Sequence, residues 1–109
     1  MPGPTTIARG NIINEKLIAV TLAPGVCAAA TTTEQAFTVP GVQVSDFISA
    51  QASVAQIAGV SIVNCRVTGA NTVAITFMNA TAGGITPAAG AYGMIWGRPE
   101  YLPLDAGVL

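Results

Sequence analysis

The fold is decided by residues 60–77, which have the sequence VSIVNCRVTGANTVAITF. Residues 60–68 and 72–77 are rich in β-branched residues, which favour extended strands over helices. Between them, Gly69-Ala70-Asn71 is typical of a tight turn. Two strand-forming runs joined by such a turn predict a β-hairpin.

The second strand of this hairpin has a clear inside and outside. Val73, Ile75 and Phe77 alternate with smaller residues, so they lie on one face of the strand. A slip of one residue in the pairing would turn all three toward solvent. We therefore expect this face to form part of the core.

Further strands are expected on both sides of the hairpin, each bounded by glycine, proline or small polar residues. They are residues 16–22, 34–39, 46–50 and 91–97. We expect a loop at 27–33, because three threonines follow its alanine run. One short helical turn is allowed in residues 51–56.

These short strands, without any amphipathic helix, predict an all-β fold. The expected architecture is a single-domain antiparallel β-sandwich or a jelly-roll-like barrel. Residues 14–98 form the predicted β-sandwich domain. Residues 1–13 are the predicted N-terminal arm, which begins with Met-Pro-Gly-Pro, and residues 99–109 are the predicted C-terminal arm.

The composition excludes several classes of partner. Of the 109 residues, 51% are hydrophobic and only 8% are charged, with a net charge of −1. The four basic residues are scattered along the chain, so they cannot neutralise a run of phosphates, and we expect no nucleic-acid partner. No apolar stretch approaches 18 residues, so we expect no membrane span. No signal-peptide pattern is visible, and production in the cytoplasm of the producing cell is expected.

Reactive side chains are scarce. The chain has no histidine, which removes the commonest general base and the commonest catalytic metal ligand. The acidic residues lie in arms or at strand edges, where lone carboxylates are usually solvated; they are Glu15, Glu34, Asp46, Glu100 and Asp105. We predict no enzyme activity, no catalytic residues, no cofactor and no metal site.

Three other residue types have both a structural and a functional interpretation. Cys27 and Cys65 could pair, but two reduced thiols at small apolar positions are favoured. Asn79-Ala80-Thr81 matches a glycosylation sequon, which we interpret as incidental without a secretion signal. Tyr92 and Trp96 share a face of the last strand and could form a platform for a sugar ring. The favoured interpretation is that they fill the core, together with Phe37, Phe47 and Phe77.

The arms supply the candidate interface residues. The C-terminal arm is apolar but is broken by Pro99 and Pro103, which excludes a helix. Apolar side chains of this kind need a protein surface to cover them, either in the same chain or in a neighbouring subunit. The predicted interface residues are Ile12, Ile13, Tyr101, Leu102, Leu104, Val108 and Leu109.

Three segments resemble small virion structural proteins of tailed bacteriophages: residues 34–42, 69–81 and 87–92. They carry the patterns QAFTVPGV, GANTVAITFMNAT and PAAGAY, and the resemblance extends over roughly residues 34–96. It implies a β-sandwich protein that decorates or cements the head surface of the virion. The implied partners are the major capsid protein and further copies of the chain, as a trimer or dimer. A tail or fibre module that binds a host receptor or glycan is the alternative.

Overall fold

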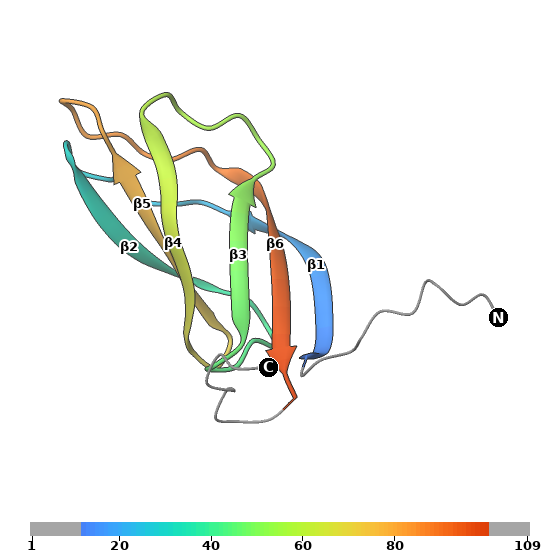
Figure 1. Cartoon of the computed structure of the whole chain (residues 1–109). Helices are drawn as coiled ribbons and strands as arrows, with labels where there is room; N and C mark the ends of the chain where they lie inside the picture. Colours follow the sequence, from blue (N-terminus) through green and yellow to red (C-terminus); the bar gives the residue numbers. More distant parts are fainter. Residues whose placement is uncertain (1–11, 101–109) are drawn as a thin grey trace, which may run out of the picture.

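The computed structural model describes residues 12–100, which form two antiparallel three-stranded sheets (Figure 1). No helix occurs in this part of the chain, and the all-β prediction is confirmed. The strands are β1 (Ile12–Leu22), β2 (Thr31–Thr38), β3 (Phe47–Ala52), β4 (Val60–Gly69), β5 (Thr72–Asn79) and β6 (Gly90–Pro99).

One sheet has the strand order β1-β6-β3 and the other has the order β2-β5-β4. The first and last described strands, β1 and β6, are therefore neighbours in one sheet, and β2 pairs with β5 in the other although β3 and β4 separate them in the sequence. The sheets approach each other along β3 and β4, which lie side by side in Figure 1. The result is a small β-sandwich whose central strands are β6 and β5.

The predicted hairpin is β4-β5. Gly69 pairs with Thr72 across the turn, and Asn71 adopts a positive φ of 60°, a conformation that asparagine tolerates better than most residues. Val73, Ile75 and Phe77 are fully buried, as their alternation predicts.

The core fills the space between the inner faces of the two sheets. Tyr92 and Met94 enter it from β6, and the Tyr92 ring meets Phe77 of β5 edge-on, with 6.4 Å between the ring centroids. The buried apolar residues that form this cluster are Leu22, Cys27, Val39, Val42, Ile48, Val60, Val73, Ile75, Phe77, Tyr92 and Met94. Trp96 and Phe37 pack against its edge.

Some strand boundaries differ from those expected. β1 begins at Ile12, inside the predicted arm of residues 1–13, because its first half pairs with the end of β6. β2 begins at Thr31, inside the predicted loop, because Thr31 to Thr33 pair with β5. Residues 51–56 contain no helical turn, since β3 continues to Ala52.

Candidate interaction face

The outer face of the β1-β6-β3 sheet carries large apolar side chains in contact with solvent. Leu17 of β1 is 81% exposed, and it lies directly opposite Ile95 of β6, which is 50% exposed. Ile95 in turn lies opposite Ser49 of β3, and Phe47, 62% exposed, follows on the same face. We call this surface the apolar face. It is formed by the outward-facing residues Leu17, Ala19, Phe47, Ser49, Gly93 and Ile95.

The apolar face is shallowly hollowed along its middle. Gly93 has no side chain and lies between Ala19 and Gln51 on the neighbouring strands. The resulting depression has a volume of about 320 Å³, and Leu17 and Ile95 form part of its wall. A surface of this shape can receive a protruding apolar side chain, but it offers no enclosed cavity for a small substrate.

Charge is nearly absent from this face. Among the outward residues of the three described strands, Glu15 alone is charged, and it lies opposite Gly97 at one end of the face. Little desolvation of charge would therefore oppose burial of the apolar face by another protein.

The outer face of the β2-β5-β4 sheet is polar by comparison. Arg66 of β4 reaches across β5 and donates two hydrogen bonds of 2.8 Å to the carboxylate of Glu34 on β2. These hydrogen bonds, together with the positive charge of Arg66, lower the pKa of Glu34 below its ordinary value. Threonines surround the ion pair on β2 and β5. The molecule thus has one polar outer face and one apolar outer face.

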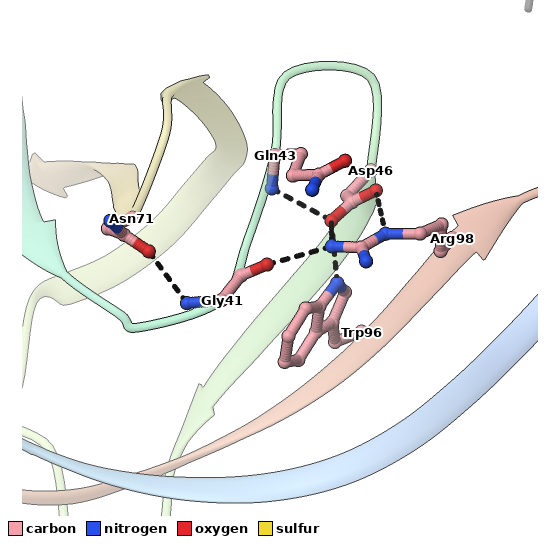
Figure 2. Close-up of polar contacts among 6 residues, drawn as sticks. All are labelled: Gly41, Gln43, Asp46, Asn71, Trp96 and Arg98. Carbon is pink, nitrogen blue, oxygen red and sulfur yellow. Dashed lines mark hydrogen bonds and ion pairs between the residues drawn. The ribbon is translucent and has the colours of Figure 1, made fainter.

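A polar cluster at one end of the sandwich fixes the direction in which β6 presents its side chains (Figure 2). Asp46 is buried at the start of β3, and its carboxylate accepts a 2.8 Å hydrogen bond from the indole of Trp96. Arg98 donates bonds of 3.1 Å and 2.9 Å to the same carboxylate. Because Trp96 and Arg98 are held inward, Ile95 and Gly97, which alternate with them along β6, face outward.

The same cluster joins the two sheets. Arg98 also donates a 2.8 Å hydrogen bond to the carbonyl of Gly41, whose N–H donates to the side chain of Asn71 at 2.7 Å (Figure 2). Gly41 has a φ of +98°, and a Cβ there would lie 2.9 Å from the Trp96 ring. Glycine is therefore required at this position by both conformation and space.

Asp46 corrects the expectation that each acid is solvated. Burial raises the pKa of Asp46, but the hydrogen bonds from Arg98, the Gln43 backbone and Trp96 outweigh this effect. Its pKa therefore lies below the ordinary value. A carboxylate held in this way acts as a structural anion.

Tyr92 and Trp96 do not form the sugar platform that was the alternative to a core position. Tyr92 is fully buried, and its hydroxyl donates a hydrogen bond to the carbonyl of Ala88, which confirms the core interpretation for this residue. Trp96 is partly buried, with Lys16 and Arg98 over its ring at 5.2 Å and 5.5 Å from the centroid.

The prediction that Phe47 lies in the core is wrong. Phe47 is exposed on the apolar face, while its neighbour Ile48 is buried. The pleat of β3 sends adjacent side chains to opposite sides of the sheet.

The two cysteines are free thiols, as the favoured interpretation predicts. Cys27 is fully buried, and burial raises the pKa of Cys65 to about 11. Asn79 of the sequon is also fully buried, and its side chain donates hydrogen bonds to the carbonyls of Cys27 and Gly83. Asn79 and Cys27 thereby connect the loops at one end of the sandwich.

Two of the predicted interface residues fall in the described part of the chain. Ile12 and Ile13 belong to β1, where they are 45% and 56% exposed. The other predicted interface residues lie outside the described residues: Tyr101, Leu102, Leu104, Val108 and Leu109.

Sequence analysis missed Leu17, Phe47 and Ile95. Their signal was present, because Leu17-Ile18-Ala19-Val20 and Met94-Ile95-Trp96 are apolar at consecutive positions. A strand that is apolar on both faces indicates that both faces are to be covered.

Residues 12–100 hold no group of three or more His, Cys, Asp or Glu residues placed to bind a metal ion. Within the same residues, no helix is long and apolar enough to cross a membrane.

Comparison with known proteins gives no match: no family model, no curated protein and no solved structure is similar to this chain at a significant level.

Proposed function

We propose that this chain is a decoration or cement protein of a tailed-bacteriophage head. It binds the major capsid protein through its apolar face and acts without catalysis. Three segments resembling small virion proteins supply the phage assignment, and the difference between the two outer faces of the sandwich supplies the mode of binding. That difference is the observation on which the proposal depends.

The apolar face has the composition expected of the centre of a protein interface. Leu17, Phe47 and Ile95 are large apolar groups around a shallow depression. Charged residues are depleted at interface cores, where desolvation of a charge is costly. A stable interface buries about 800 Å² per partner, and large apolar side chains near its centre carry most of the binding free energy.

Cementing follows from repetition of such contacts. A ligand that binds the assembled shell but not its separated subunits stabilises the assembled state by mass action. When copies are linked to one another, their binding is further strengthened through the high effective concentration of neighbouring sites. The sandwich supports this role because it offers a rigid scaffold with an exposed apolar face.

The experiment measures binding of the chain to phage heads that lack it, by co-sedimentation. Ile95→Lys places a charge at the centre of the apolar face, and we expect it to weaken binding at least tenfold. Met78→Lys is the matched control, because Met78 is an exposed apolar residue on the outer face of the other central strand, β5. This control is expected to bind as the unchanged chain does.

Equal binding by Ile95→Lys and the unchanged chain would contradict the assignment of the apolar face. Absence of binding by the unchanged chain would contradict the cement function itself. Both variants alter exposed side chains, so circular dichroism is expected to show an intact β-fold in each.

A further inference from the structure

The free edge of β1 is the second surface for which the described contacts provide no partner. In the described part of the chain, β1 pairs with β6 alone, and it forms the outer edge of its sheet (Figure 1). An edge strand exposes unpaired backbone N–H and C=O groups that can bind another strand. At 11 residues, β1 is long for such an edge.

The β1 edge lacks most of the features that protect edge strands. Charged residues, prolines, bulges and short length usually prevent edge pairing. In β1 the bulge lies at Ile12 to Asn14 and the charges are Glu15 and Lys16, so all of these lie in its first half. The second half, residues 17–22, has the uncharged sequence LIAVTL.

The other outer edge, β2, is different. It begins with three threonines and continues with Glu34 and Gln35. The Gln35 side chain accepts a 2.6 Å hydrogen bond from the N–H of Gly25 and donates one of 2.9 Å to its carbonyl. A polar edge that already contacts a loop of its own chain is the poorer site for strand addition.

We propose that β1 pairs antiparallel with β1 of a second copy of this chain, about a two-fold axis at Leu17. This inference deepens the proposed function. It rests on one part of that function, namely that copies of the chain associate with one another. The partner is a second copy because a two-fold axis brings the same surface of both subunits together. Each residue of β1 then pairs with a residue of β1 in the other copy.

The register of the β1-β1 pair follows from the length of β1 and from the positions of its charged residues. Ile12–Leu22 is centred on Leu17, so an axis there pairs the full strand with its copy. A shift of the axis to Lys16 or to Glu15 would place like charges directly opposite each other, which is destabilising. A shift to Ile18 would leave the first two residues of the strand unpaired.

In this register Leu17, the most exposed large residue of the apolar face, lies beside Leu17 of the second copy. Residues directly opposite each other in an antiparallel pair point to the same side of the sheet. The two apolar faces therefore join into one continuous surface across six strands. The dimer would present the capsid with two adjacent copies of the same binding face.

The first test is the molar mass of the full chain, measured by size-exclusion chromatography with light scattering. We expect a dimer, and we expect Leu17→Lys to shift it to a monomer. Ile95→Lys is the control: it carries the same charge on the adjacent strand, away from the edge, and is expected to remain a dimer. A monomeric full chain would overturn the inference, as would an Ile95→Lys variant that dissociates to the same extent as Leu17→Lys.

The second test fixes the register by disulfide trapping in a Cys65→Ala background. Paired residues in antiparallel strands have Cα atoms about 4.5–5.5 Å apart, within the range that a disulfide spans. Leu17→Cys is therefore expected to form a covalent dimer on mild oxidation. Ala19→Cys is expected to stay monomeric on denaturing gels, since residue 19 lies opposite Glu15 of the second copy.

Crosslinking of Ala19→Cys in preference to Leu17→Cys would overturn the proposed pairing, as would failure of both to crosslink. The two proposals are separable by experiment. A chain that binds heads as a monomer would contradict only the dimer, and a dimer that ignores heads would contradict only the cement function.

Discussion

Asp46 joins parts of the chain that are far apart in the sequence. Its carboxylate accepts hydrogen bonds from the N–H of Gln43, from the indole of Trp96 and from the guanidinium of Arg98. Its side chain is 3% exposed, against 32% for Arg98. A carboxylate with this many charge-assisted bonds stabilises the fold only while it is ionised.

Replacement of Asp46 by Asn is expected to destabilise the protein by about 2 kcal/mol at pH 7, because hydrogen bonds to a buried charged group are lost. Chemical denaturation measures this change. Glu34→Gln is the matched control, since it also removes one carboxylate from an arginine pair. It is expected to have a much smaller effect, because that pair is solvent-exposed.

The pH dependence of stability provides a separate test of Asp46. Its pKa is lowered in the folded state, while in the unfolded chain it is about 3.9. The stabilisation is therefore fully present above about pH 4 to 5 and is lost as the pH falls through the folded-state pKa. Thermal melts of Asp46→Asn are expected to show a weaker loss of stability between pH 5 and 2. Parallel curves for the two proteins would contradict this account.

The role of Asp46 could not be predicted from the sequence. A lone acid before a strand is usually solvated, and the two side chains that bind this one, Trp96 and Arg98, lie about fifty residues away. Phe47 illustrates the opposite error. The scarcity of aromatic residues favoured a core position, but the pleat of β3 assigns that position to Ile48.

At the scale of elements, the β4-β5 hairpin contributes two strands to its sheet, and its turn also binds the connection between β2 and β3. Asn71 in its turn accepts a hydrogen bond from the N–H of Val39 and donates one to the carbonyl of Val42, both at 2.9 Å. Its side chain accepts a third from Gly41. The hairpin turn therefore holds the β2-β3 connection in place, and with it the cluster around Asp46.

Substitution of Asn71 separates backbone conformation from side-chain bonding. Asn71→Ala loses the bond to Gly41 and adds the strain of a positive φ, so we expect a loss of about 1–3 kcal/mol. Asn71→Gly loses only the side-chain bond without that strain, so it is expected to be less destabilising. Denaturant unfolding of both variants measures the difference, and a glycine variant less stable than the alanine variant would refute this explanation.

The strands themselves were largely predictable, because alternation and turn residues are local signals. The hairpin over residues 60–77 and the buried face of Val73, Ile75 and Phe77 are confirmed. The starts of β1 and β2 were not predicted correctly, because Ile12 and Thr31 are held in an extended conformation by pairing with strands that are distant in the sequence. That pairing cannot be predicted from the local sequence.

At the scale of the whole molecule, the apolar face is a product of topology. Its three strands come from the two ends and the middle of the sequence. The exposed positions Leu17, Phe47 and Ile95 become neighbours only in the folded sheet. The sequence therefore predicted interface residues mainly in the arms, whereas the large exposed apolar side chains of this sheet lie on its outer face.

We propose that this chain is a repeated component of a phage head, bound through protein contacts. The most direct measurement is the molar ratio of this chain to the major capsid protein in purified particles of the phage that encodes it, by quantitative mass spectrometry. We predict a ratio of the order set by the repeating lattice of the shell, with hundreds of copies in each particle. Absence from the particles, or only a few copies in each, would contradict the account.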